Sequence, residues 1–189
     1  MSNRIGMIVD GEGDFASLRK HFVEGYRILK TDGPRGHTAR IADIASRAKK
    51  QIGILRAFQC SRVVVVLDFE SRTITYNNFV RELRDAFKPY ASDVSDVSVD
   101  VAVPNRMIEN WYLADIEEIS RKRAFIRDNL RQKNYEGKHG KEEIKKCMIN
   151  GVTYSETEHG PQMFATIRFD VAKMNSPSFA EFLNLIQWN

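Results

Sequence analysis

Cysteine is scarce in this sequence, and long apolar runs are missing. Cys60 and Cys147 are the two cysteines among 189 residues, and their wide separation fits neither a disulfide framework nor a zinc site. No apolar run approaches the roughly 20 residues that a transmembrane helix requires. The residues from Met1 to Arg4 lead into a short apolar stretch that lacks the features of a signal peptide. We therefore expect a cytoplasmic protein without membrane association.

Charge is plentiful but unevenly distributed along the chain. The net charge is +4, and residues 30–62 contain eight basic and two acidic residues. Residues 120–146 contain ten basic and four acidic residues, whereas residues 91–118 contain seven acidic and one basic. Basic stretches beside an acidic one suit a protein that binds a polyanion next to a metal site. Solvated helix faces are the alternative interpretation.

Strand-like and helix-like patterns alternate along the first two thirds of the chain. The valine-rich segment 62–67 is apolar without alternation, as expected of a strand that is buried on both faces. The other expected strands are 4–9, 26–29 and 97–103, and the expected helices are 15–23, 38–58, 76–87 and 107–119. This order predicts an α/β fold with a mainly parallel, Rossmann-like sheet flanked by helices.

The last third is less regular. Residues 133–146 contain Gly137 and Gly140 and predict an exposed loop. Residues 163–188 predict helix with a break at 175–177, where Ser176 caps a last helix that has Pro177 at its first position. We expect an α/β core at residues 1–119, with a basic loop and a helical C-terminal extension at 120–189 packed on it in a single domain.

Acidic residues follow two of the predicted strands. Asp10, Glu12 and Asp14 come after the first strand, and Asp68 and Glu70 come after the valine-rich strand. Ligands of parallel α/β sheets bind outside the carboxyl ends of the strands, and carboxylate oxygens suit Mg²⁺ or Mn²⁺. On an extended segment Asp68 and Glu70 would point the same way and share an ion. Alternatively, such acids cap the helix that follows.

Glu109 provides a further acidic position at the start of a predicted helix. Its neighbours one turn on are Tyr112 and Leu113, so it lies near an apolar face. A carboxylate in such a place is paired, protonated or bound to a metal. A first-turn glutamate favoured by the helix dipole is the alternative.

Several common motifs are missing from the sequence. We find no phosphate-binding P-loop, no serine nucleophile elbow and no His-Glu-x-x-His. Gly11 and Gly13 match only a fragment of a dinucleotide fingerprint, so we expect no nucleotide cofactor. His37 and His159 can assist at a phosphate, although a lone loop histidine is more often a surface residue.

In their order and spacing, these motifs resemble those of the Toprim domain, the metal-dependent catalytic fold of topoisomerases, primases and the overcoming-lysogenization-defect nucleases. Toprim proteins have a glutamate after the first strand and an Asp-x-Asp after a later strand, to which residues 9–14 and 66–70 correspond. The chain also resembles a small bacterial Toprim-like family of unknown function, whose Glu-x-Trp-x-Leu-Ala-Asp segment matches residues 109–115. Tyr154, His159-Gly160 and residues 176–179 echo that family's C-terminal pattern. Three acids differ in length from the pattern, namely Asp10, Asp14 and Glu70.

The resemblance implies a nuclease that hydrolyses phosphodiester bonds in DNA or RNA with Mg²⁺ or Mn²⁺. The implied catalytic residues are Asp10, Asp68 and Glu109, and the implied metal ligands are Asp10, Asp14, Asp68 and Glu70. The residues expected to bind the phosphate are Arg35, His37, Lys138 and Lys141. Glu12 is an alternative to Asp10 as the leading acid, and Asp115 is a candidate for supporting the metal ligands from outside.

The resemblance also implies partners. These are nucleic acid, an ATPase and a role in defence against phage, with a homo-oligomer as a further expectation. Two other functions remain open. One is a non-catalytic, degenerate Toprim module that holds nucleic acid or docks on an ATPase, and the other is a phosphatase or phosphotransferase for small molecules.

Overall fold

The secondary structure of the computed structural model follows the predicted alternation of strands and helices. The structure describes residues 4–34, 36–92 and 96–188. The elements in chain order are β1 (Arg4–Val9), α1 (Glu12–His21), β2 (Tyr26–Lys30), α2 (Ile41–Ala57), β3 (Cys60–Val66), α3 (Tyr76–Ser92), β4 (Ser98–Ala102), α4 (Glu109–Leu113), α5 (Ile116–Lys122), α6 (Gly140–Cys147), α7 (His159–Phe164), α8 (Phe169–Asn175) and α9 (Pro177–Leu185). Among the described residues, no helix is long and apolar enough to cross a membrane.

The four strands form one sheet in which every neighbouring pair is parallel. The strand order is β2-β1-β3-β4, so β1 and β3 lie in the centre. The chain builds outward from β1 to β2 on one side and from β3 to β4 on the other. The order therefore reverses between β1 and β3, which is where open α/β sheets bind their ligands. The predicted α/β fold with a parallel, Rossmann-like sheet is confirmed.

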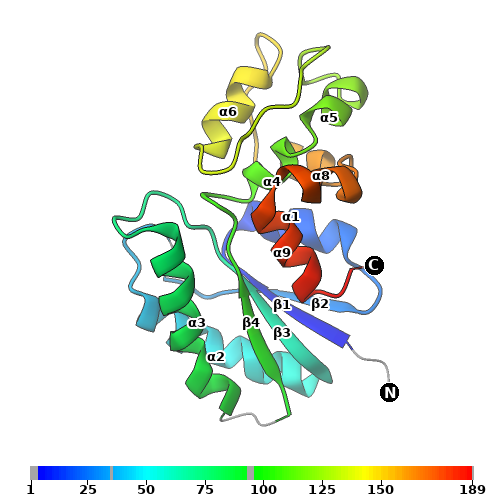
Figure 1. Cartoon of the computed structure of the whole chain (residues 1–189). Coiled ribbons are helices and arrows are strands. Elements are labelled where there is room, and N and C mark those ends of the chain that lie inside the picture. The colour runs from blue at the N-terminus through cyan, green and yellow to red at the C-terminus, as the bar shows by residue number, and fades with distance from the viewer. Residues whose placement is uncertain (1–3, 35, 93–95, 189) are drawn as a thin grey trace.

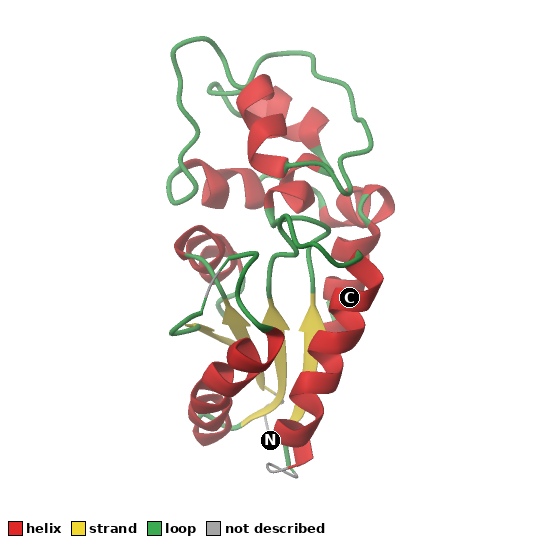
Figure 2. Ribbon diagram, turned by 90° about the vertical axis from the view of Figure 1, so that its left-hand side faces the viewer, coloured by secondary structure: helices red, strands yellow, loops and turns green. Residues whose placement is uncertain are grey.

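Helices cover both faces of the sheet (Figures 1 and 2). Because side chains alternate along a strand, Val64 and Val66 of β3 pack with α1 and α9, whereas Val63 and Val65 pack with α2 and α3. These four valines are at most 1% exposed. The valine-rich strand is therefore buried on both faces, as its composition predicts.

The C-terminal helices complete one of these two cores. The predicted break before the last helix is confirmed, because the Ser176 Oγ accepts a hydrogen bond from the Phe179 N–H (3.2 Å) and Pro177 opens α9. Phe179 and Phe182 are fully buried in the same core as β1 and α1. The region after residue 120 thus supplies a layer of the sheet's packing.

Residues 105–175, which carry α4 to α8, form a cap. Figure 2 shows the strands ending beneath helices and loops, and Figure 1 places α5 and α6 at the far end from α2 and α3. Two predictions are wrong here. Residues 140–147 are the helix α6, not part of a loop. The helix expected at 107–119 is split into α4 and α5, because the Asp115 side chain turns inward and accepts hydrogen bonds from the N–H and Nη2 of Arg168 (both 2.8 Å).

Candidate functional site

The two central strands direct their carboxyl ends at one place beneath the cap. Asp10 follows β1 directly, and Asp68 follows β3 after Leu67. The Ile108 N–H, just before α4, donates a hydrogen bond to Asp68 Oδ1 (3.0 Å). This bond joins the end of β3 to the start of the cap. The candidate site therefore lies at the point where the strand order reverses.

Asp14 lies in the first turn of α1 and is 9% exposed. The Gly11 N–H donates to its Oδ2 (3.2 Å). Burial raises the pKa of Asp14 to about 6, against the lowering effects of the Gly11 hydrogen bond and of the positive charge of Lys141. The carboxyl group is thus held in an environment that disfavours its charge.

Asp68 is perturbed by its burial and by the acids around it. The pKa of Asp68 is raised well above its usual value, first by burial and then by the negative charges of Asp14 and Glu109. The charge of Glu70 acts in the same direction on Asp14 and Asp68, more weakly. Acids from the ends of both central strands and from α4 therefore share one electrostatic environment.

Glu109 is the most deeply buried acid of this group, at 2% exposed. The Tyr154 hydroxyl donates a hydrogen bond to its Oε1 (3.1 Å), whereas its Oε2 has no hydrogen-bond partner among the described residues. Burial raises the pKa of Glu109 to about 7, and the charge of Asp14 adds to this rise. The predicted proximity of Glu109 to an apolar face is confirmed, and one oxygen is left for a ligand or a proton.

Lys141 is the cation that faces these acids. Its positive charge lowers the pKa values of Asp14, Asp68 and Glu109, and its Nζ lies 2.6 Å from Glu156 Oε1. Lys141 is the second residue of α6, which follows Gly140. The cap therefore delivers one ammonium group to a cluster of buried carboxyl groups.

Two glycines allow close contacts, one within the cap and one between the cap and α1. A Cβ atom at Gly140 would lie 2.7 Å from the Glu109 Cβ, and one at Gly13 would lie 2.8 Å from the Glu156 Cβ. No residue with a side chain fits at these distances without movement of the backbone or its neighbours. The absence of a side chain at Gly140 allows α6 to approach α4, and its absence at Gly13 allows residue 156 to approach α1.

The expected geometry of Asp68 and Glu70 is wrong. Glu70 has a φ of 54°, so the chain turns there and the two side chains do not follow a regular extended alternation. The Glu70 carboxylate instead lies 3.9 Å from the His37 Nδ1. Its charge still reaches Asp68, but its position links the site to the loop that follows β2.

Arg72 stabilises the loop between β2 and α2. Its guanidinium donates hydrogen bonds to the main-chain carbonyl oxygens of Gly36 (3.1 Å), His37 (3.2 Å) and Ala39 (2.8 Å). Burial lowers the pKa of Arg72, and the negative charges of Glu70 and Asp10 oppose this effect. Arg72 therefore stands among the acids that follow β1 and β3.

The other predicted acidic residues lie in different surroundings. Glu12, the alternative to Asp10, is exposed and forms an ion pair with Lys30. Asp115 is 1% exposed and holds Arg168, so its role is structural.

Of the predicted basic residues and histidines, some lie at the site and others lie elsewhere. Lys141 lies in the site, His37 lies beside Glu70, and Arg35 lies outside the described residues. The Lys138 Nζ lies over the Tyr135 ring at 5.5 Å from its centroid. His159 is buried and its Nδ1 accepts a hydrogen bond from the Ser155 N–H (2.9 Å), which marks a structural role.

Sequence reasoning missed three side chains of the site, Arg72, Glu156 and the role of Tyr154. Tyr154 lies 45 residues after its partner Glu109, and Glu156 lies 15 residues after Lys141. The partners of each pair are too far apart in the sequence for helix or strand periodicity to predict the contact. The contacts can be seen only in the folded structure, where the chain returns over the sheet.

The donor chemistry of the cluster fits a divalent cation of the magnesium type. Within residues 4–34, 36–92 and 96–188, no group of three or more His, Cys, Asp or Glu side chains is arranged to hold a metal ion. Mg²⁺ typically takes only one or two carboxylates, together with water and substrate phosphate. The raised pKa values and the partnerless Glu109 Oε2 show carboxyl groups that a cation would stabilise. The residues fit an open site of this kind and do not form a closed cage.

Fold and site together define a parallel α/β protein with a buried acidic site where the strand order reverses. The chain belongs to the DUF4276 family, described as a domain of unknown function, whose family model matches residues 11–187. No curated protein and no solved structure matches the chain.

Proposed function

We propose that this chain is a Mg²⁺- or Mn²⁺-dependent nuclease of the Toprim type, which hydrolyses phosphodiester bonds in DNA or RNA. One observation carries the proposal. Asp14, Asp68 and Glu109 come from three separate segments, the charge of Asp14 raises the pKa values of the other two, and the charge of Lys141 lowers the pKa values of all three. Holding such acids together opposes folding, so a functional use is the simplest reason for the arrangement.

In this proposal the carboxylates of Asp10, Asp14, Asp68 and Glu70 are the candidate ligands, of which one or two would hold the metal ion together with water and substrate phosphate. When bound, the ion would neutralise charge on the phosphate and lower the pKa of water. The Ile108 N–H keeps the Asp68 carboxylate in place. Arg72 keeps the loop beside Glu70 in place.

Glu109 suits proton transfer. A carboxyl group with a pKa of about 7 can accept or release a proton at neutral pH. The Tyr154 hydroxyl fixes one oxygen, so the proton would be exchanged at Oε2. Lys141 would bind the substrate phosphate and stabilise the charge that develops on its oxygens.

A second candidate is a non-catalytic module that binds nucleic acid or docks on an ATPase. It is favoured by the absence, within the described residues, of a preformed group of three metal ligands. It is favoured also by the ion pair between Lys141 and Glu156, which brings a cation to the acids without any metal.

The resemblance to the overcoming-lysogenization-defect nucleases adds an ATPase partner and a role in defence against phage to the proposal. A cytoplasmic location is part of it as well. Cys60 and Cys147 are both free and buried, as in proteins of reducing compartments.

Cleavage assays with Asp68→Ala test the nuclease proposal. Plasmid DNA and total RNA are incubated with Mg²⁺, Mn²⁺ or EDTA, and Asp170→Ala serves as a control because Asp170 is an exposed aspartate on α8. Wild type and Asp170→Ala should cleave one polymer in a metal-dependent way, and Asp68→Ala should lose roughly 100-fold or more of the rate. Full activity of Asp68→Ala would contradict the proposal, and no cleavage by wild type would favour the binding module.

A further inference from the structure

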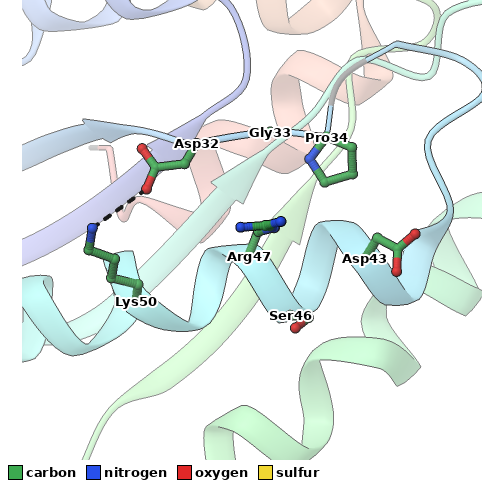
Figure 3. Close-up of a pocket in the computed structure, with 7 residues that line it drawn as sticks. All are labelled: Asp32, Gly33, Pro34, Asp43, Ser46, Arg47 and Lys50. Atoms are coloured by element: carbon green, nitrogen blue, oxygen red, sulfur yellow. Dashed lines mark ion pairs between the residues drawn. The ribbon is translucent and has the colours of Figure 1, made fainter.

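The two basic stretches of the sequence differ in how the fold neutralises them. In the first, Lys30 pairs with Glu12, Lys50 lies 3.8 Å from Asp32 and Arg56 lies 3.0 Å from Asp96. Figure 3 shows the pocket of about 910 Å³ between residues 32–34 and α2, where acidic and basic side chains share the walls. This stretch presents mixed charge to a ligand.

The second stretch is only partly neutralised. Two lysines of α6 pair with glutamates of the same helix, Lys145 with Glu142 and Lys146 with Glu143. On α5, Arg121 and Lys122 both pair with the buried Glu118. The helices of this stretch therefore carry little unbalanced charge.

The unbalanced charge lies on the loop between α5 and α6. Arg127, Arg131 and Lys133 are exposed, and no carboxylate lies within ion-pairing distance of any of them in the part of the chain that the structure describes. Three cations without a counterion on one exposed segment form a local positive field. We call these three residues the basic loop surface.

This surface is fixed relative to α6. The Arg127 N–H donates to the Cys147 carbonyl oxygen (2.8 Å), and Ile126 forms an antiparallel bridge with Met148. The charges of Arg127 and Lys133 both lower the pKa of the Cys147 thiol, which places the two side chains near the same end of α6. Arg131 lines a hollow of about 360 Å³ that it shares with Arg121 and with the acids Glu117 and Asp128, and in the described part of the chain neither acid forms an ion pair with Arg131.

The same loop leads into the candidate site. The Asn110 side chain, next to Glu109, donates hydrogen bonds to the carbonyl oxygens of Tyr135 (2.5 Å) and Lys138 (3.1 Å). Two residues further on, α6 begins and Lys141 enters the acidic cluster. Arg127 and Lys133 lie near Cys147 at the last turn of α6, whereas Lys141 lies in its first turn. A polyanion bound at both places would therefore extend along α6, over about 9 Å at 1.5 Å per residue.

The surface offers charge but no stacking platform. Phe125 is partly buried in the core, and Tyr135 is only 5% exposed. Within residues 121–139 of the described chain, no phenylalanine, tyrosine or tryptophan ring is exposed, and the exposed ring of His139 lies outside the three residues of the basic loop surface. Recognition by this surface would therefore depend on phosphates. An interfacial membrane helix would need an apolar face beside its charges, and the three residues lie on a loop.

We propose that Arg127, Arg131 and Lys133 bind the backbone phosphates of a nucleic acid whose scissile bond lies at the acidic site. The proposal rests on the proposed function for the class of partner. Binding would be largely independent of sequence and strongly dependent on salt, because each neutralised phosphate releases counterions.

Binding measured in EDTA separates this surface from cleavage. The affinity for a fluorescent 30-base-pair DNA duplex is followed by anisotropy from about 50 to 200 mM salt. The variant Arg127→Gln, Arg131→Gln, Lys133→Gln should reduce the slope of log K against log salt by about 2 to 3, since each contact contributes about 0.9. The control Arg47→Gln, Lys50→Gln, Arg56→Gln removes three α2 charges that lie near acids and should change the slope by less than about 1.

Three results would overturn the proposal. They are an equal or larger effect of the α2 control, an unchanged slope in the loop variant, and binding of anionic lipid vesicles but not of the duplex. The single variant Arg131→Gln, with a slope lower by about 1, supports the proposal if the triple variant proves poorly folded. Failure of cleavage leaves this readout intact, because a non-catalytic module would show the same change of slope.

Discussion

Glu109 is the residue in which the stability and the proposed activity of this protein are most directly opposed. It is 2% exposed, yet only one of its oxygens has a hydrogen-bond partner among the described residues. Folding raises its pKa from 4.5 to about 7. The folded protein therefore retains a proton between about pH 4.5 and 7 that the unfolded chain releases, and stability is lost as the pH rises through this range. The cost above pH 7 is of the order of 3 kcal/mol.

The variant Glu109→Gln should remove this cost together with the proposed activity. The amide keeps the shape and the Tyr154 hydrogen bond but carries no charge, so the variant should be more stable than wild type at pH 8 and lose less stability between pH 5 and 8. Asp14, whose pKa is raised to about 6, and Asp68, whose pKa is also raised, should leave a dependence of the same sign. Thermal unfolding in EDTA measures both effects.

The exposed Glu142 provides a control for this change. Glu142 is exposed to solvent and pairs with Lys145 on α6. Glu142→Gln should therefore leave the pH dependence of the unfolding free energy as it is in wild type. A Glu109→Gln variant with the wild-type profile would show that Glu109 is ionised without cost. The two proteins are compared directly because burial lowers the pKa of His21, which contributes a stability that rises with pH in both.

At the scale of elements, the helices of the cap were harder to predict than those around the sheet. Gly137 and Gly140 in residues 133–146 indicate a loop, but Gly140 is the first residue of α6. A glycine stands there because a Cβ atom would lie 2.7 Å from the Glu109 Cβ. The break between α4 and α5 depends on Asp115 and Arg168, which are 53 residues apart. Both features come from contacts distant in sequence, which override local patterns.

Gly140→Ala tests the close approach of α6 to α4. The added methyl group would lie 2.7 Å from the Glu109 Cβ and 3.1 Å from the Asn110 main-chain nitrogen, so α6 must shift. We expect a loss of about 1–3 kcal/mol, which lowers Tm by several degrees because 1 kcal/mol corresponds to about 2–4 °C at this size. Any cleavage activity should fall as well, since Lys141 moves with the helix.

Gly53→Ala is the matched control for this prediction. Gly53 lies inside α2, and a Cβ there would meet nothing within 4 Å. Alanine should stabilise that helix by about 0.5–1 kcal/mol. An equal change of Tm in the two variants would mean that α6 and α4 are not in close contact at Gly140.

At the scale of the whole molecule, the sequence indicates what lies at each strand end but not how the ends meet. The unbroken apolar run of β3 and the acids after β1 and β3 identify a parallel sheet with an acidic edge. The strand order, and the return of the chain that brings Tyr154 to Glu109, arise only in three dimensions. The sheet, the last helix with its Ser176 cap and the acids after the strands were thus predictable. The cap was not, and the helix expected from residue 163 to the break at 175 is divided into α7 and α8.

The central claim is that acids from separate segments form one site for a divalent cation. Calorimetric titration of the metal-free protein with Mn²⁺ near pH 7, in buffers of different ionisation enthalpy, tests it most directly. We predict binding with release of protons, because Asp14 and Glu109 have pKa values of about 6 and 7. Asp68→Asn should bind at least about tenfold more weakly. Equal affinity of this variant and wild type, or no binding by wild type at millimolar Mn²⁺, would contradict the claim.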